Sequence, residues 1–271
     1  MSRKRRRLDA EMVRRGLVSS RDRAGEAVVA GRVMVNGTVV QRPARLVLAG
    51  DALVLMGPPP RYVGRGGEKL EGALAAFELD VAGRWCCDVG ASTGGFTDCL
   101  VQSGAAGVVA LDVGRAQIHE RLAADPRVSV YERTDVRDVD PADIGAPFDL
   151  VTADVSFISL VTVMPALAGL AAPGAPLVVL VKPQFEVGRQ EARRGQGVIR
   201  DPEQWRIALD RVLGAAVESG VAPQAAAQSV LMGAKGNVEF FVLLEKGGVA
   251  STVDVAKVVS VANDQSAAGG Q

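Results

Sequence analysis

The sequence predicts an α/β protein in two parts, a small α+β module followed by a larger and mostly parallel sheet. From residue 84 onward, short apolar segments alternate with helical ones, as is typical of a doubly wound parallel sheet. The stretch Gly57-Pro58-Pro59-Pro60 cannot continue a helix or a central strand and marks a boundary. The charges divide in the same way: residues 1–70 carry 15 Lys/Arg against 6 Asp/Glu, and residues 71–271 carry 16 against 25.

Composition excludes several classes of protein. With 48% hydrophobic and 23% charged residues among 271, the chain is not a disordered one. Its single histidine, His119, excludes histidine-based metal centres, and we expect no metal. Its three cysteines lack zinc spacing, so we expect reduced thiols in a cytoplasmic protein. The basic first part predicts a polyanionic partner, with a merely solvated basic face as the alternative.

Residues 1–56 form the predicted first domain. A helix is expected from Arg7 to Arg15, ended by Gly16, and a second from a Ser19-Ser20 cap to about residue 30. The Asn36-Gly37 pair between two apolar runs predicts a hairpin. One or two further strands are expected over 46–48 and 51–55.

Several short motifs of this first part resemble one known domain. They are Arg7-Leu8-Asp9, Arg14-Arg15-Gly16-Leu17, Ser20-Arg21 and Gly31-Arg32-Val33-x-Val35-Asn36-Gly37. Together they are similar to the RNA-binding domain of the ribosomal protein S-four type, which implies binding to structured RNA through phosphates. The candidate RNA-binding residues are Arg6, Arg7, Arg14, Arg15, Arg21, Arg23, Arg32 and Arg65.

A linker is expected over 57–68, and a second domain over 69–246. It should begin with a helix over about 69–79 and continue into a seven-stranded sheet whose last two strands are antiparallel. The expected strands are 85–89, 107–112, 128–131, 148–153, 177–181, 227–231 and 238–244. Residues 247–271 are expected to form a C-terminal helix and a disordered tail.

The 27 residues from Val155 to Val181 carry no charge, which raises the question of a membrane helix. Pro165, Pro173, Gly174 and Pro176 divide this run into a helix of about twelve residues, a turn and a short strand. We therefore expect a buried helix and a buried parallel strand.

A glycine-rich loop follows the first strand of the sheet, where such folds bind ligands. It runs from Asp88 through Gly90-Ala91-Ser92-Thr93-Gly94-Gly95-Phe96, and its spacing differs from G-x-G-x-x-G. Asp112 lies 22 residues past Gly90, where it can accept hydrogen bonds from a ribose diol. Asp135 follows the third strand, where an adenine amino group could be bound. A purely structural turn and an NAD site remain as alternatives.

Two further polar residues end apolar strands, Asp154 and Lys182, while Lys69 precedes the sheet and Glu239 lies near its last strand. Ligands bind at the carboxyl ends of parallel strands. Burying such groups without a function would be costly. These four residues are therefore candidates for catalysis.

The glycine-rich loop resembles that of the class I, Rossmann-like methyltransferases in their FtsJ-like form, and the order Lys69, Asp154, Lys182, Glu239 resembles the catalytic tetrad of those enzymes. With the first domain, the chain is similar over residues 5–246 to the TlyA/hemolysin A family. The resemblance implies S-adenosylmethionine-dependent 2′-O-methylation of cytidine in 23S and often also in 16S ribosomal RNA. We expect the protein to be a monomer. Lys182 would accept or polarise the 2′-OH proton. The implied cofactor-binding residues are Asp88, Gly90, Ala91, Ser92, Thr93, Gly94, Gly95, Phe96, Asp112, Val113, Asp135 and Asp154.

One departure from the family, in the linker, and two alternative functions remain open. The linker reads Pro60-Arg61-Tyr62-Val63, where the family often has Arg-x-Trp-Val. A non-catalytic RNA-binding or ribosome-assembly protein would show a damaged loop or lack the lysines. A membrane-active hemolysin would need a spanning or amphipathic element, which the prolines of 155–181 oppose.

Overall fold

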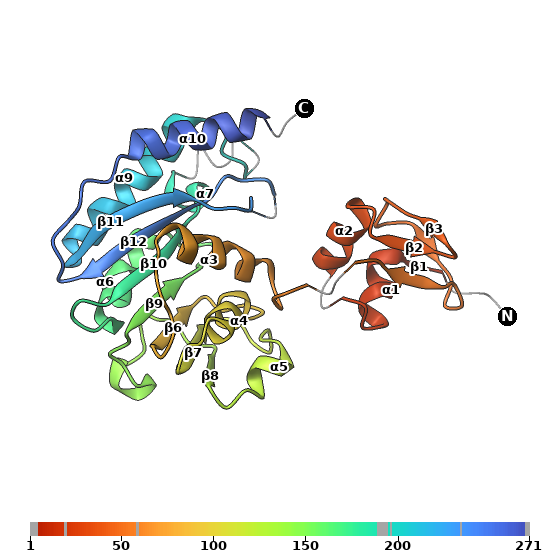
Figure 1. The fold of residues 1–271 in the computed structure, drawn as a ribbon, viewed down its shortest axis with the longest axis horizontal. Coiled ribbons are helices and arrows are strands. Elements are labelled where there is room, and N and C mark those ends of the chain that lie inside the picture. Colours follow the sequence, from red (N-terminus) through yellow and green to blue (C-terminus); the bar gives the residue numbers. More distant parts are fainter. Residues whose placement is uncertain are drawn as a thin grey trace. The chain divides into compact units, whose positions relative to one another are not determined.

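The computed structural model describes residues 5–18, 21–57, 60–188, 195, 197–233 and 235–268. The chain forms two compact units, Met1–Arg61 and Tyr62–Gln271 (Figure 1). The predicted helix cap at Ser19-Ser20 lies outside the described residues.

The first unit packs two helices on two small sheets around one apolar core. Val35 and Thr38 pair across the predicted hairpin, whose turn residues Asn36 and Gly37 have φ of 50° and 81°. Leu8, Met12 and Val28 are fully buried in the core. The elements are β1 (Arg6–Arg7), α1 (Leu8–Arg14), α2 (Arg21–Val29), β2 (Val33–Val35), β3 (Thr38–Val39), β4 (Leu46–Val47) and β5 (Leu53–Leu55).

The second unit is built on a seven-stranded sheet with the order β11-β12-β10-β9-β6-β7-β8 (Figure 1). The five strands from β10 to β8 run parallel, and β12 runs antiparallel to both of its neighbours. The strands are β6 (Trp85–Val89), β7 (Gly107–Asp112), β8 (Val128–Glu132), β9 (Leu150–Ala153), β10 (Pro176–Val181), β11 (Val221–Gln228) and β12 (Phe240–Lys246). The mostly parallel seven-stranded sheet is confirmed.

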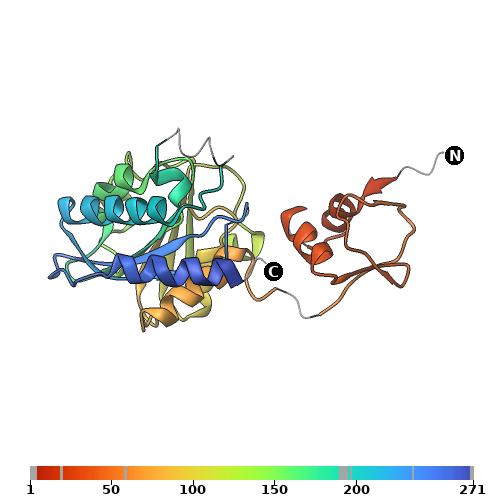
Figure 2. The ribbon, with the colours of Figure 1, turned by 90° about the horizontal axis from the view of Figure 1, so that it is seen from above.

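Alternate residues of the strands enter two separate cores, one on each face of the sheet. Cys87, Val109 and Val179 pack with α6, α9 and α10, whereas Cys86, Val108 and Val178 pack with α3 and α4. Figure 2 shows α9 (cyan) and α10 (blue) from above. The helices are α3 (Arg65–Ala76), α4 (Gly95–Gln102), α5 (Glu120–Ala123), α6 (Leu160–Leu170), α7 (Pro183–Glu186), α9 (Pro202–Glu218) and α10 (Val255–Ala268), with a 3₁₀ turn over Pro141–Ile144.

Two elements differ from the prediction. Helix α3 begins at Arg65 instead of residue 69. Its first turn contains glycines that pack closely on neighbours: a Cβ at Gly67 would lie 2.3 Å from the Tyr62 ring. Strand β11 spans Val221–Gln228 instead of 227–231. Its Pro223 is tolerated because β11 is an edge strand, with an irregular register between Pro223 and Ala225.

The uncharged run forms α6 and β10, as expected, and both are largely buried. None of the helices in the described ranges is long and apolar enough to cross a membrane. The three cysteines are buried in the second unit and are in no disulfide.

Candidate active site

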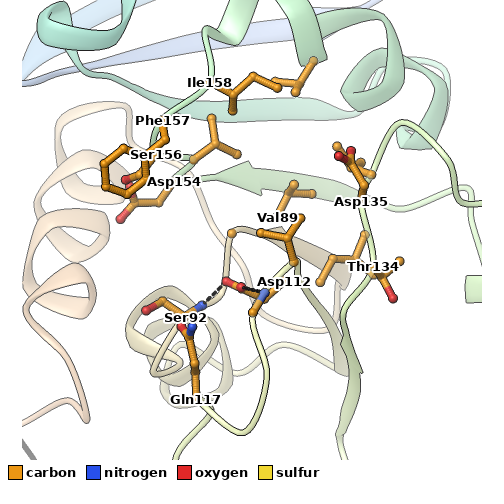
Figure 3. Close-up of a pocket in the computed structure, with 17 residues that line it drawn as sticks. Val89, Ser92, Asp112, Gln117, Thr134, Asp135, Asp154, Ser156, Phe157 and Ile158 are labelled. Atoms are coloured by element: carbon orange, nitrogen blue, oxygen red, sulfur yellow. Dashed lines mark hydrogen bonds between the residues drawn. The ribbon is translucent and has the colours of Figure 1, made fainter.

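A cavity of about 350 Å³ lies at the carboxyl ends of β6, β7 and β9. Asp154, Ser156 and Phe157 lie at one end of it, and Thr134 and Asp135 at the other (Figure 3). Among the described residues that line it there is no lysine or arginine. The lining therefore favours a ligand that carries positive charge over one that carries a pyrophosphate. Of the predicted cofactor-binding residues, it contains Gly90, Ser92, Asp112, Val113, Asp135 and Asp154.

Asp112 organises the loops around this cavity. Its two carboxylate oxygens accept hydrogen bonds from the backbone N–H of Ser92, at 2.7 Å, and of Gly114, at 2.6 Å (Figure 3). Gly90, with φ of 85°, lets the loop pass against β9, because a Cβ there would lie 2.5 Å from the carbonyl oxygen of Asp154. Asp135 pairs with Arg137, which lowers the pKa of Asp135 to about 2 and keeps it an acceptor at neutral pH.

A second cavity of about 140 Å³ adjoins the first and shares Gly90, Ser92 and Asp154 with it. Its walls are the start of α3, residues 64–66, and the glycine-rich loop. Of the predicted cofactor-binding residues, the loop supplies Ala91, Thr93, Gly95 and Phe96 here. Gly94, with φ of 94°, caps the start of α4.

Asp88 lies beneath the loop and is fully buried. Its carboxylate accepts hydrogen bonds from the hydroxyls of Thr97, at 2.6 Å, and Thr152, at 3.3 Å. Burial raises the pKa of Asp88 to about 7, against the opposing effect of the Thr97 hydrogen bond. The structure thus places Asp88 where it joins β6, β9 and α4 to each other.

The four candidate catalytic residues lie near the carboxyl ends of the parallel strands. Asp154 directly follows β9, and Lys182 directly follows β10. Glu239 directly precedes the antiparallel β12, whose Phe240 pairs with Val181. Because β12 runs antiparallel, its start lies beside the carboxyl ends of the parallel strands.

These residues form two ion pairs. The Nζ of Lys182 lies 2.5 Å from Oδ1 of Asp154 and donates to the Ser156 hydroxyl at 2.7 Å. The Nζ of Lys69, on α3, lies 2.5 Å from Oε2 of Glu239. The second pair is more deeply buried, since the side chain of Glu239 is 3% exposed and that of Asp154 is 23% exposed. Each lysine therefore has a carboxylate partner of its own.

Sequence reasoning missed residues in the loop after Asp154. Phe157 is 93% exposed, has φ of 66° and contacts the Phe185 ring with centroids 5.4 Å apart. Buried Glu186 holds this loop, because it accepts bonds from the Ser159 hydroxyl and the Leu160 N–H. An exposed aromatic side chain at the cavity mouth offers a stacking surface for a base. Gln117 and Thr134 of the cavity were also missed.

The predicted RNA-binding arginines have different surroundings. Arg6, Arg7, Arg14 and Arg21 have half-exposed side chains in the first unit. Arg15 is 22% exposed, and Arg32 donates to the Met56 carbonyl. Arg65 belongs to the second unit, where it donates to the Met232 carbonyl, and Arg23 lies on α2.

Comparison with known proteins agrees with this geometry. The FtsJ-like methyltransferase family matches residues 62–246, and the S4 domain matches residues 6–53. The 16S/23S rRNA (cytidine-2′-O)-methyltransferase TlyA of Mycobacterium tuberculosis is 49% identical, over 89% of this chain and 90% of that protein. Hemolysin A of Brachyspira hyodysenteriae is 36% identical, over 86% and 97%. A solved structure from Streptococcus thermophilus, described as a hemolysin, has a TM-score of 0.80 and 37% identity, over 99% of both chains. The chain belongs to the TlyA/hemolysin A family of FtsJ-like methyltransferases that carry an S4 domain.

Proposed function

We propose that this protein transfers a methyl group from S-adenosylmethionine to the ribose 2′-OH of a cytidine in 16S or 23S ribosomal RNA. One observation carries the proposal: the Lys182–Asp154 pair lies at the rim of an acidic cavity in an FtsJ-like methyltransferase domain. The named activity of the M. tuberculosis relative supports the substrate. We propose that it acts as a monomer in the cytoplasm, where ribosomes are assembled.

The cavities fit S-adenosylmethionine. Asp112 and Asp135 present carboxylates suited to a ribose diol and an adenine amino group, and Asp154 lies where the two cavities meet. A cationic sulfonium suits walls without lysine or arginine among the described residues of the larger cavity. When bound, S-adenosylmethionine supplies an activated methyl group, so the chain's residues need only align the acceptor and remove one proton.

We assign the removal of that proton to Lys182. Asp154 and Ser156 fix the Nζ of Lys182 at distances of 2.5 and 2.7 Å, so that it can point to a ribose hydroxyl. As the ammonium of this ion pair, Lys182 polarises the 2′-OH, and as the neutral amine it accepts the 2′-OH proton. Lys69 and Glu239 form a buried pair, in which Glu239 precedes Phe240, the residue that pairs with Val181 next to Lys182, and this pair positions the acceptor. Phe157 lies at the mouth, where a base can stack on it.

The test is transfer of tritiated methyl groups to purified 30S and 50S subunits. Lys182→Ala should lower the rate at least about 100-fold while donor affinity stays within about twofold. Lys257→Ala, which removes an exposed lysine on α10, is the matched control and should keep the wild-type rate.

Each other outcome has a defined meaning. Full methylation by Lys182→Ala with normal donor binding would refute the role of the lysine. No label on either subunit, despite donor binding, would point to another RNA. No label and no donor binding would leave a non-catalytic RNA-binding protein.

A further inference from the structure

Two carboxylates of the first unit are almost completely buried although they lie among arginines. Asp9 is 4% exposed and Glu11 is 1% exposed, and both belong to the short helix α1. A buried carboxylate is costly unless hydrogen bonds and opposite charges surround it.

Asp9 holds two guanidinium groups. Arg7 donates to it through Nε, at 3.1 Å, and through Nη2, at 2.7 Å, which is the two-pronged geometry of a strong arginine–carboxylate pair. Arg21, which begins α2, donates to the same carboxylate at 3.1 Å. The hydrogen bond from Arg7 lowers the pKa of Asp9 to about 2, so this carboxylate stays ionised at neutral pH.

Glu11 holds three guanidinium groups. Arg14 donates to it through Nε at 2.8 Å and Nη2 at 2.5 Å, and Arg15 donates through Nε at 2.8 Å. Arg6 lies 3.5 Å away. The pKa of Glu11 is about 2, lowered first by the hydrogen bond from Arg14 and then by that from Arg15.

Four of these five arginines have about half of their side chains exposed to solvent. The exposed fractions are 45% for Arg6, 48% for Arg7, 49% for Arg14 and 58% for Arg21. We call these four residues the arginine array. Nη1 of Arg7 and Nη1 of Arg14 take no part in the bonds to the carboxylates, so each guanidinium keeps a donor for another acceptor.

Arg15 differs from the array although it is adjacent in sequence to Arg14. Besides its bond to Glu11, it donates to the carbonyls of Asp51, Leu48 and Ala49, at 2.7, 3.3 and 2.9 Å. All three of its nitrogens are therefore engaged, and it ties α1 to the turn before β5. Its chemistry is that of a structural cross-link.

We propose that Asp9 and Glu11 are positioning residues for RNA binding, which fix the arginine array for contact with backbone phosphates, and that Arg15 is structural. This inference rests on the proposed function, since it requires that the first unit binds ribosomal RNA. The physical reason is preorganisation: a guanidinium that is already held loses less conformational freedom when a phosphate binds.

The sign of one measurement tests the proposal. If only net charge mattered, replacing a carboxylate beside the RNA by an amide would strengthen binding. If positioning matters, the same replacement weakens it, because the released arginines must be ordered by the RNA. Asp9→Asn and Glu11→Gln are the test variants. Asp51→Asn is the matched control: it removes one negative charge from the same unit, and the Asp51 carboxylate accepts from the Leu48 N–H and the Asn36 amide.

The dissociation constants for purified 30S and 50S subunits would be measured from 50 to 200 mM salt, with donor affinity as a check of the second unit. We expect Asp9→Asn and Glu11→Gln to bind about tenfold more weakly than wild type. The salt slope should become shallower by about 0.7–0.9 for each phosphate that the variant no longer neutralises. Asp51→Asn should match wild type or bind more tightly.

Two results would overturn the proposal in distinguishable ways. The positioning role alone would be refuted if the wild-type protein methylates and binds the subunits and Asp9→Asn and Glu11→Gln bind them equally well or more tightly. Absence of salt-dependent binding by the wild-type protein to either subunit would refute RNA binding by this unit, and the positioning role with it.

A second pair of variants decides the matter if the carboxylate variants fail to fold. Arg14→Gln should make the salt slope shallower, and its effect on the unfolding midpoint should be limited to the loss of its bonds to Glu11. Arg15→Gln should lower the midpoint further, because three backbone carbonyls also lose their donor, and should leave the salt slope unchanged. The reverse pattern would overturn the assignment of the two residues.

Discussion

Asp88 is a buried carboxyl group whose surroundings favour its protonated form. Because its pKa of about 7 lies above the value of 3.8 for a free aspartate, the folded state retains a proton that the unfolded chain loses. This contribution to stability is full below about pH 4 and is lost as the pH rises through 7. We expect the free energy of unfolding to fall by about 2.5 kcal/mol from pH 5 to pH 8 through this group.

Urea unfolding of wild type and Asp88→Asn at pH 5, 6, 7 and 8 measures this contribution. The neutral amide does not titrate, so the variant should lose that part of the pH dependence. Parallel curves for the two proteins would mean that Asp88 is ionised throughout this range.

The two lysines of the candidate site should differ in their effect on stability. Lys69→Ala leaves Glu239 buried at 3% exposure without its partner, whereas Lys182→Ala leaves Asp154 at 23% exposure. We expect Lys69→Ala to cost about 3 kcal/mol of unfolding free energy, and Lys182→Ala clearly less. Denaturant unfolding of both variants compares them directly, and equal losses would contradict the difference in burial.

At the scale of single residues, the sequence predicted that Asp112, Asp154 and Lys182 lie at strand ends, and the structure places them there, while their roles stay predictions. It could not identify Phe157, whose distinguishing property is a backbone φ of 66° in a loop. Nor could it separate Arg14 from Arg15, because that difference lies in carbonyl groups more than thirty residues away.

Helix α3 shows how close packing can outweigh helix propensity. Alanine is preferred over glycine inside a helix by about 1 kcal/mol. At Gly67, however, a Cβ would meet the Tyr62 ring at 2.3 Å, whereas at Gly214, in the middle of α9, nothing lies within 4 Å. We expect Gly67→Ala to destabilise the protein by about 1–3 kcal/mol and Gly214→Ala to stabilise it by about 0.5–1 kcal/mol.

Thermal unfolding of the two variants tests this prediction, because the same change from glycine to alanine should lower the midpoint at Gly67 and raise it at Gly214. If both substitutions raised the midpoint, propensity alone would decide, and the packing of Tyr62 beneath α3 would be irrelevant to stability.

At the scale of elements, the central strands were predicted closely because buried parallel strands are continuous apolar runs bounded by turns. Strand β6 has the expected bounds, Trp85–Val89. The edge strand β11 was misplaced because its sequence, Val-Ala-Pro-Gln-Ala-Ala-Ala-Gln, lacks both alternation and strong strand formers. Its position is set by pairing with β12, which is information outside the segment.

The division of charge between the two parts of the chain predicts a selective effect of salt. The predicted RNA-binding arginines other than Arg65 lie in the first unit, and the cavity proposed to bind the donor lies in the second. Raising salt from 50 to 200 mM should raise the KM for ribosomal subunits roughly 10- to 100-fold, because phosphate contacts are screened and counterions are no longer released favourably. Donor affinity should change less than about twofold, since short-range contacts dominate there.

Initial-rate kinetics with either substrate varied, together with calorimetric titration of the donor, measure both effects. If salt weakened donor binding as strongly as RNA binding, the assignment of RNA contacts to the first unit would lose its basis. At the scale of the whole molecule, composition alone indicated the two-part organisation, because the difference in charge between the two parts does not depend on the exact bounds of helices and strands.

The burial of all three native thiols has a practical consequence. Cys86, Cys87 and Cys99 are each 0% exposed, and burial raises the pKa of Cys86 to about 12 and that of Cys87 as well. Because the thiolate is the reactive form, these residues should resist maleimide reagents in the folded protein. A single cysteine introduced on the surface of either unit can therefore carry a fluorescent label without background from the native residues.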